Sequence, residues 1–259
     1  MSEASKKNKF ALNFIDSGRG EVALVFLHYF GGSSRTWAKV INELNGEFRC
    51  IAIDLPGFGA SQSSCNKLSV SDIRESVAEV IESLQLEKYA LIGHSMGGKI
   101  ALSLASHKPS GLKKLVLFAP SPPTPEPISA EERTQLLNAY NNRPGLINII
   151  NNITSQPLPE VIINKLVDDN LRASSTAWTS WIKHGSQEDI SVQMADINIP
   201  ALVISGQYDK KLSADFLRNV FATYLRNVHF KEIGKAGHLL PIEAPPAVAE
   251  LIRETVKNK

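Results

Sequence analysis

Short apolar runs of strand length alternate with amphipathic stretches of helical period along most of this 259-residue sequence. The apolar runs predict strands, because they are too short for buried helices and are bounded by turn residues. They are Val22–Leu27, Cys50–Ile53, Tyr89–Ile92, Lys114–Phe118, Ala201–Ile204 and Val228–Ile233. Strands that alternate with helices are joined by crossover connections, which place helices on both faces of a parallel sheet. We therefore expect an α/β fold with a mostly parallel central sheet flanked by helices.

Apolar residues three and four positions apart predict the helices between these strands. The longest stripe covers residues 70–84 and begins after Ser69, a favoured N-cap residue. A shorter stripe covers residues 37–44. Another, at residues 248–256, follows a proline pair that starts at Pro245 and suits the first turn of a helix.

The residues before the first of these strands predict one antiparallel pair. Residues 10–15 form a further apolar segment, and residues 16–20 are typical of a turn. We expect this segment to form an edge hairpin with the strand that begins at Val22.

The alternation is interrupted between residues 120 and 195. The segment Ala119–Pro127 holds five prolines, which exclude a helix or a central strand there. The patterns that follow are helical and lie at Asn138–Thr154, Val161–Leu171 and Ala177–Ile182. We expect residues 120–195 to form a helical cap, inserted after the sixth strand into a core made of residues 1–119 and 196–259.

Charge and composition exclude several classes of protein. Lys and Arg number 28 and Asp and Glu 26, and a net charge of +2 is small for a protein that binds nucleic acid. The polar N-terminus lacks the apolar region of a secretion signal, and no apolar run is long enough to span a membrane. Cys50 and Cys65 are the only cysteines, which suits two free thiols in a reducing compartment. We expect a cytoplasmic protein with no nucleic-acid or membrane partner; a monomer and a homodimer both remain open.

The segment GHSMGG, residues 93–98, carries the first candidate for chemistry. It follows a predicted strand directly and opens a predicted helix, Met96–Ser106. Small residues around Ser95 allow a tight turn that exposes its hydroxyl at the helix N-terminus, where the N–H of Met96 and the helix dipole favour negative charge. We interpret Ser95 as a nucleophile; the alternative is a glycine-rich turn with an incidental serine.

Two further candidates also follow predicted strands. Asp209 stands just beyond the strand that starts at Ala201, and His238 lies on the loop begun by Gly237, after the last strand. Alone, each is an ordinary turn or loop residue. In the order Ser95, Asp209, His238, however, they match one known arrangement of a serine triad. His238 would then act as general base toward Ser95, and Asp209 would hold its imidazole.

The sequence predicts neither a metal nor a cofactor. The remaining histidines show no spacing typical of metal ligands. The glycines of residues 93–98 have neither the dinucleotide-binding nor the Walker spacing.

Five segments together resemble the α/β-hydrolase superfamily, in particular its compact bacterial branch of esterases, lactonases and haloperoxidase-like enzymes. They are HYFGGS at 28–33, DLPGFGAS at 54–61, GHSMGG at 93–98, the acidic strand end at Asp209, and GHLLPIEAP at 237–245. The resemblance covers residues 1–119 and 196–259, and it implies a cofactor-free hydrolase that forms an acyl-enzyme on Ser95. It also implies a structural role for DLPGFGAS, in which Gly57 and Gly59 shape a turn and Asp54 supports loops near the site.

The loop HYFGGS is the expected second side of an oxyanion hole. We expect the N–H of Phe30, with that of Tyr29 as the alternative, to act beside that of Met96. The family commonly has glycine where this chain has Tyr29, and a side chain there makes a positive φ costly. The ring of Tyr29 would narrow the acyl pocket, or its hydroxyl would add a donor.

The predicted function is the hydrolysis of small-molecule esters or lactones, with carboxylic esters of small or medium acyl chain as the first choice. Tyr29, Trp178, Trp181 and Leu239 are the candidates to bind substrate; the spacing of the two tryptophans fits packing against the core equally well. A lactonase, a thioesterase, a C–C bond hydrolase or a haloperoxidase-like perhydrolase would use the same triad. A non-catalytic receptor for a small ligand would also be able to keep it.

Overall fold

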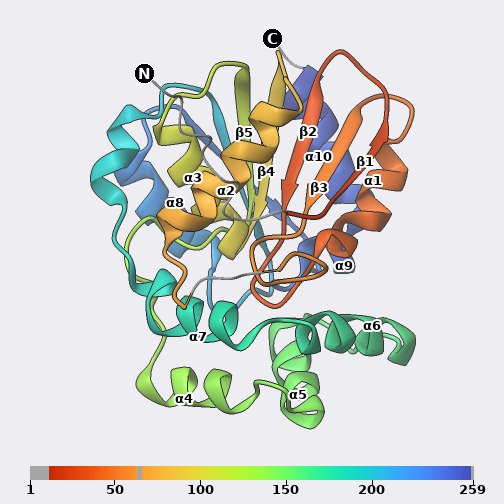
Figure 1. The fold of residues 1–259 in the computed structure, drawn as a ribbon, viewed down its shortest axis with the longest axis vertical. Coiled ribbons are helices and arrows are strands. Elements are labelled where there is room, and N and C mark those ends of the chain that lie inside the picture. The colour runs from red at the N-terminus through yellow and green to blue at the C-terminus, as the bar shows by residue number, and fades with distance from the viewer. Residues whose placement is uncertain (1–11, 63–65, 258–259) are drawn as a thin grey trace, which may run out of the picture.

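The strands of this protein form one mostly parallel sheet. The computed structural model describes residues 12–62 and 66–257. Within them the sheet has seven strands in the order β1-β3-β2-β4-β5-β6-β7 (Figure 1), and only β1 pairs antiparallel. The strands are β1 (Phe14–Gly18), β2 (Ala23–Leu27), β3 (Arg49–Ile53), β4 (Tyr89–His94), β5 (Leu112–Phe118), β6 (Ala201–Gly206) and β7 (Val228–Ile233).

Helices cover both faces of the sheet, as expected. They are α1 (Ala38–Leu44), α2 (Val70–Ser83), α3 (Met96–Ser106), α4 (Ala130–Asn138), α5 (Arg143–Ile153), α6 (Glu160–Leu171), α7 (Ser175–Lys183), α8 (Ala214–Tyr224), α9 (Leu240–Glu243) and α10 (Pro245–Lys257). Buried residues of α2, α3 and α8 form a core on one face, and those of α1 and α10 form a second core on the other. Every residue of β2, β4 and β6 is buried, which is typical of strands covered on both sides.

The helix boundaries follow from local signals in the sequence. Ser69 caps α2: its hydroxyl accepts from the N–H of Asp72 at 3.0 Å, and the Asp72 carboxylate accepts from the N–H of Ser69 at 3.0 Å. This reciprocal capping box satisfies two N–H groups that the helix leaves free. Pro245 begins α10, where a proline loses no hydrogen bond.

The predicted edge hairpin with the strand at Val22 is wrong, because the edge strand pairs with another strand. β1 is an antiparallel edge strand, but it pairs with β3, with Phe14 opposite Ile53, because β3 and β4 occupy both edges of β2. The predicted turn starts later than expected, since residues 16–18 belong to β1. Residues 10 and 11 of the predicted segment lie outside the described residues.

The helical insertion follows the fifth described strand and not the sixth, so this prediction is also wrong. Within the described residues only β1 precedes β2, which makes β5 the fifth strand. The helices α4, α5, α6 and α7 then follow before β6, and they lie together below the sheet in Figure 1. The proline-rich segment 119–127 contains neither helix nor strand, as predicted.

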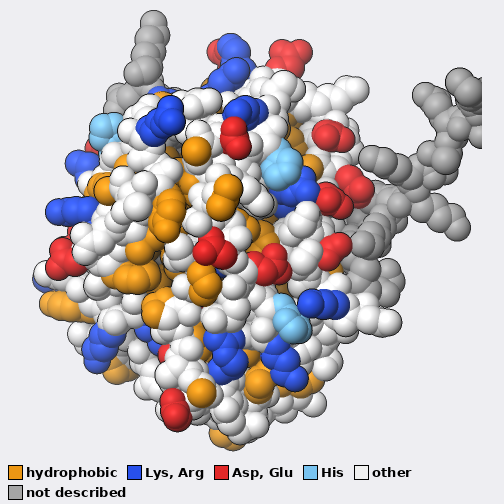
Figure 2. All heavy atoms as spheres, turned by 90° about the vertical axis from the view of Figure 1, so that its left-hand side faces the viewer, with side chains coloured by type: hydrophobic (Ala, Val, Ile, Leu, Met, Phe, Trp, Pro, Cys, Tyr) orange, Lys and Arg blue, Asp and Glu red, His pale blue; other side chains and the backbone are white. Residues whose placement is uncertain are grey.

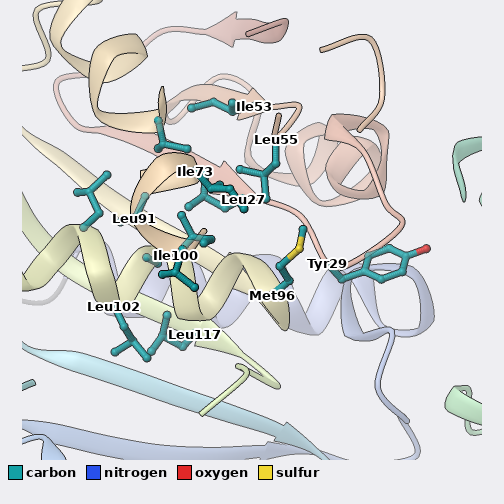
Figure 3. Close-up of a cluster of buried hydrophobic side chains, with 14 of the residues drawn as sticks. Leu27, Tyr29, Ile53, Leu55, Ile73, Leu91, Met96, Ile100, Leu102 and Leu117 are labelled. Atoms are coloured by element: carbon teal, nitrogen blue, oxygen red, sulfur yellow. The ribbon is translucent and has the colours of Figure 1, made fainter. Parts of the chain in front are cut away.

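Apolar contacts fix α3 against the centre of the sheet. Met96 and Ile100 of α3 lie beside Leu27 of β2 and Leu91 of β4 (Figure 3), and all four side chains are fully buried. Burying such side chains stabilises the fold by about 1.5 to 3 kcal/mol each. This packing holds the N-terminus of α3, and with it the turn at Ser95, at the end of β4.

The face drawn in Figure 2 and the described cysteine, Cys50, give no further candidate site. On the face drawn in Figure 2, basic and acidic side chains of the described residues are interspersed. No helix in the described ranges is both long and apolar enough to cross a membrane. Cys50 is a buried free thiol in β3, and Cys65 lies outside the described residues.

The segment DLPGFGAS supports the loops around it, as the resemblance implied. The buried carboxylate of Asp54 accepts from the N–H groups of Ser34 at 2.6 Å and Ala60 at 2.9 Å, and from the amide of Asn13 at 2.8 Å. Gly59 takes a φ of +56°, and a Cβ there would lie 2.3 Å from the Asp54 carboxyl carbon. Burial raises the pKa of Asp54, but these hydrogen bonds, with the field of His28, outweigh burial and lower it.

Replacing Asp54 with alanine is expected to lower the free energy of unfolding at pH 7 by about 3 kcal/mol, because buried N–H donors lose their acceptor. The folded-state pKa of Asp54 is depressed, so its contribution is complete above the unfolded value of about 4 and is lost as the pH falls through the folded value. Urea denaturation at several pH values checks both statements. A difference between wild type and variant that stays constant from pH 7 to pH 3 would contradict the assignment.

Candidate active site

Ser95 lies in a tight turn between β4 and α3. Its φ of 52° and ψ of −117° are strained for a residue with a side chain. The turn brings the backbone of α3 against the loop after β2, and a Cβ on Gly97 would lie 2.4 Å from the carbonyl oxygen of Leu27. Glycine at position 97 is therefore required for this close approach, which leaves Ser95 at the N-terminus of α3.

Three side chains from three separate loops form one hydrogen-bonded chain at this end of the sheet. Nε2 of His238 lies 3.0 Å from Oγ of Ser95, and Nδ1 of His238 lies 2.7 Å from Oδ2 of Asp209. With the proton of the neutral imidazole on Nδ1, His238 donates to Asp209 and accepts from Ser95. These are the three residues that the sequence singled out, and the fold brings them together.

The carboxylate of Asp209 accepts three hydrogen bonds. Its Oδ1 accepts from the N–H groups of Lys211 and Leu212, each at 3.0 Å, while Oδ2 accepts from His238. Burial raises the pKa of this carboxyl, but the field of His238 and the three hydrogen bonds outweigh burial and lower it. Asp209 is therefore ionised at neutral pH, and its orientation is fixed from both sides.

Glu243 holds the loop that carries His238, a role not predicted from the sequence. Its carboxylate accepts from the N–H groups on either side of His238, those of Gly237 and Leu239, each at 3.0 Å. It also accepts from the N–H of Ser155 at 2.7 Å, just after α5. The signal was present in GHLLPIEAP, where an acid follows the histidine by five residues at a helix start.

His94 and the end of α5 supply two further contacts to the same loop. Nε2 of His94 lies 2.8 Å from the carbonyl oxygen of His238, and the N–H of His238 donates to the carbonyl oxygen of Ile153 at 2.8 Å. Burial, with the nearby charge of His238, lowers the pKa of His94 to about 3. His94 is therefore a neutral donor that fixes the His238 backbone.

The loop HYFGGS lies beside the Ser95 turn, as expected for an oxyanion hole. The N–H of Gly97 donates to the carbonyl oxygen of His28 at 3.1 Å, which ties the loop to α3. The N–H groups of Phe30 and Met96 have no hydrogen-bond acceptor in the described part of the chain. Two free donors near a nucleophile suit the stabilisation of a developing oxyanion.

Tyr29 fits this loop without backbone strain. The left-handed position of the loop is Gly31, with a φ of +82°, and Tyr29 is not among the residues of positive φ. The ring of Tyr29 is buried, and its centroid lies 5.4 Å from that of His94. Burial raises the pKa of its hydroxyl. Tyr29 therefore fills space beside the site without straining the backbone.

A mostly apolar cavity opens onto Ser95 and His238. Tyr29, Trp178 and Trp181 line it, as predicted; the other lining residues are Phe30, Glu126, Pro127, Ile128, Glu132, Leu136, Ile149, Ile150, Ile153, Asn170, Ile182, Lys211 and Leu212. The tryptophans also pack: Nε1 of Trp178 donates to the carbonyl oxygen of Leu136 at 3.0 Å, and its ring centroid lies 4.5 Å from that of Phe30. Leu239 does not line the cavity, because its side chain is fully buried in the core.

The cavity is also lined by charged side chains that were not predicted from the sequence. Lys211 forms an ion pair with Glu132, and Glu126 lies on the same wall. Lys211 is far from Glu126 and Glu132 in the sequence, so no local pattern links it to them. As for metals, no group of three or more His, Cys, Asp or Glu side chains within residues 12–62 and 66–257 is placed to bind one.

Known proteins resemble this chain in sequence and in fold. Residues 22–148 match the family model described as alpha/beta hydrolase fold. The chain is 30% identical to the hydrolase YugF of Bacillus subtilis over 92% of this chain and 91% of that one. It is also 30% identical to the 2-hydroxy-6-oxononadienedioate/2-hydroxy-6-oxononatrienedioate hydrolase of Paraburkholderia phymatum, over 88% of this chain and 84% of that one. A solved esterase of Thermogutta terrifontis superposes with a TM-score of 0.83 at 25% identity, over 96% of this chain and 93% of that one.

The mostly parallel sheet of seven described strands, flanked by helices, agrees with these similarities in fold. The sequence resemblance and the structure thus lead to one conclusion: the chain belongs to the α/β-hydrolase family.

Proposed function

We propose that this protein is a serine hydrolase that cleaves carboxylic esters of small or medium acyl chain. The observation that carries the proposal is the hydrogen-bonded chain of Asp209, His238 and Ser95 at the base of an apolar cavity. Such a chain activates a hydroxyl that is otherwise a weak nucleophile. The position of Ser95 at a helix N-terminus, beside free N–H groups, supports acyl transfer over simple ligand binding.

The first half of the reaction forms an acyl-enzyme. Oγ of Ser95 attacks the ester carbonyl carbon while Nε2 of His238 takes its proton. Asp209 stabilises the resulting imidazolium, and the N–H groups of Phe30 and Met96 donate to the oxyanion of the tetrahedral intermediate. His238 then returns the proton to the departing alcohol oxygen, and the carbon–oxygen bond to the alcohol breaks.

The second half releases the acid. Water takes the place of the alcohol, and His238 removes its proton as the water oxygen attacks the acyl carbon. The tetrahedral intermediate again places its oxyanion at Phe30 and Met96. The proton returns to Oγ of Ser95 as the acyl–serine bond breaks, and the enzyme is regenerated.

The helical segment would form the substrate pocket. We propose that residues 120–195 act as a cap over a core of residues 1–119 and 196–259, because the cavity draws its apolar wall from α5 and α7 and its base from Ser95 and His238. An apolar wall favours an uncharged acyl or alcohol chain. Ester, lactone and thioester substrates all present a carbonyl that this arrangement accepts.

The charges of the cavity argue against one alternative substrate class. The Paraburkholderia relative is named for a dicarboxylate substrate, and binding a dianion requires cations. The described lining contains two carboxyl side chains, Glu126 and Glu132, and Lys211 already pairs with Glu132. This balance favours neutral esters over dicarboxylates.

Initial rates on p-nitrophenyl esters from acetate to decanoate test the proposal. We expect hydrolysis with an optimum at a short or medium acyl chain, because the cavity wall is apolar but bounded by Trp178 and Trp181. Release of p-nitrophenolate is followed by absorbance, with uncatalysed hydrolysis subtracted. A folded protein, verified by circular dichroism, that hydrolyses none of these esters would refute it.

A further inference from the structure

Glu126 is a cavity residue with one carboxyl oxygen that lacks a partner among the described residues. Its Oε1 is buried and has no hydrogen-bond partner among the described residues, whereas Lys211 and Glu132, on the same cavity, pair with each other. A buried acceptor without a donor costs about 1 to 3 kcal/mol. Native proteins satisfy nearly all such groups, so the donor is expected from outside the chain.

The backbone of Glu126 is held firmly, which fixes where its side chain begins. Its N–H donates to the carbonyl oxygen of Ser186 at 2.8 Å. Its own carbonyl oxygen accepts from the N–H of Ile128 at 2.8 Å and from Nε2 of Gln187 at 3.1 Å. A group pre-positioned in this way loses little conformational entropy when it binds a ligand.

The surroundings of Glu126 favour an uncharged donor. Burial raises the pKa of its carboxyl above the ordinary value, and this effect outweighs the Ser121 hydroxyl, Lys99, His238 and Lys211, which act in the opposite direction. Lys99 is itself fully buried, with Nζ donating to the carbonyl oxygen of Thr124 at 3.1 Å. Two lysines, Lys99 and Lys211, already lie near Glu126, so their charges would repel a substrate ammonium, whereas a hydroxyl would not be repelled.

We propose that Oε1 of Glu126 accepts a hydrogen bond from a hydroxyl group of the substrate, which makes this protein selective for hydroxylated esters. The inference rests on the proposed function, since it places this hydroxyl in the same cavity as Ser95 and His238. The remainder of the lining is largely apolar, so one hydroxyl on an otherwise apolar chain complements it. Glu126 is then a specificity-determining residue and takes no part in the proton transfers at His238.

Matched pairs of esters that differ by one hydroxyl test the inference. The acyl side is probed with methyl 3-hydroxyhexanoate and methyl 6-hydroxyhexanoate against methyl hexanoate, and the alcohol side with 6-hydroxyhexyl acetate against hexyl acetate. Acid release is titrated at constant pH. We expect wild-type kcat/KM to favour at least one hydroxylated ester by about 10-fold, the effect of one well-formed hydrogen bond.

Variants of Glu126 show whether that carboxyl is the cause. In Glu126→Leu the ratio of kcat/KM for the hydroxylated ester to that for the unsubstituted ester is expected to fall to about one, whatever the absolute rates become. In Glu126→Gln, which retains an acceptor, most of the preference is expected to remain. General damage to the fold would lower both rates equally and leave their ratio unchanged. Glu131→Gln, an exposed carboxylate on α4, is the matched control. A wild type without any preference, or a preference that Glu126→Leu retains, would overturn the inference.

Calorimetry separates this inference from the proposed function. Ser95→Ala is titrated with the same ester pairs, and a hydroxylated ester is expected to bind about 10-fold tighter. Adding Glu126→Leu to the Ser95→Ala protein is expected to abolish this difference in affinity. Tighter binding without wild-type hydrolysis would refute the esterase proposal alone, whereas hydrolysis with equal binding of every pair would refute the role of Glu126 alone.

Discussion

Replacing Ser95 with alanine is expected to lower kcat for p-nitrophenyl esters by about 10⁴-fold or more. The variant removes the atom that forms the acyl-enzyme, and the remaining groups can only assist attack by water. Oγ of Ser95 is the group within hydrogen-bonding distance of Nε2 of His238, at 3.0 Å. Steady-state rates measure the loss. The variant is purified separately, so that it is not contaminated by wild-type enzyme.

The matched control for this variant is Ser103→Ala. Ser103 lies about two turns further along α3 and is buried, but it does not line the cavity. The Ser103→Ala change therefore removes a hydroxyl from the same helix without altering the site. The kcat of this variant is expected to stay within two-fold of wild type. If Ser95→Ala retains a tenth or more of the wild-type rate, the nucleophile has been misassigned.

Replacing Asp209 with asparagine is expected to lower kcat at neutral pH by about 10⁴-fold, the effect of a wrong imidazole tautomer in a serine triad. The geometry explains why. Oδ1 of Asp209 accepts from the N–H groups of Lys211 and Leu212, so the amide oxygen of asparagine would take that place. Its NH₂ group would then face Nδ1 of His238, which would have to accept. The imidazole proton would move to Nε2, where it prevents acceptance of the Ser95 proton.

Asp215→Asn is the control for charge alone. Asp215 is exposed in the first turn of α8, so its loss is expected to change stability by a few tenths of a kcal/mol and kcat hardly at all. Burst kinetics with p-nitrophenyl acetate would show whether acylation is the step that Asp209→Asn slows. An Asp209→Asn enzyme within ten-fold of wild type would show that this carboxylate does not set the tautomer.

The two halves of the molecule meet at the loop of His238. The N–H of His238 donates to the end of α5 at Ile153, and Glu243 accepts from both this loop and Ser155. The proposed cap thus contributes backbone contacts to the proposed general base as well as a wall of the cavity. Changes in the cap sequence are therefore expected to alter the placement of His238 along with the shape of the pocket.

Local signals in the sequence were sufficient for the helices α1, α2, α3 and α10 and for the strands that carry the site. The stripe at residues 70–84 behind Ser69 predicted α2, because helix period and capping depend on neighbours three or four residues away. The order of Ser95, Asp209 and His238 was also readable, since parallel strands bring their carboxyl ends to one edge of the sheet. The turn around Ser95 needed small residues, which the sequence displays.

Pairings and side-chain environments between distant segments needed the tertiary structure. The partner of β1 depends on which strand edges the rest of the sheet leaves free, so the predicted hairpin with the strand at Val22 was wrong. Leu239 follows His238 in sequence, yet it points into the core. Glu126 looked like one residue of a proline-rich connection, and only the fold places its carboxyl in the cavity. The sequence by itself determined the local elements and the order of the reactive groups, because short-range sterics and strand direction fix them. The tertiary structure decided which side chains face the substrate, because burial and charge depend on segments far apart in the chain.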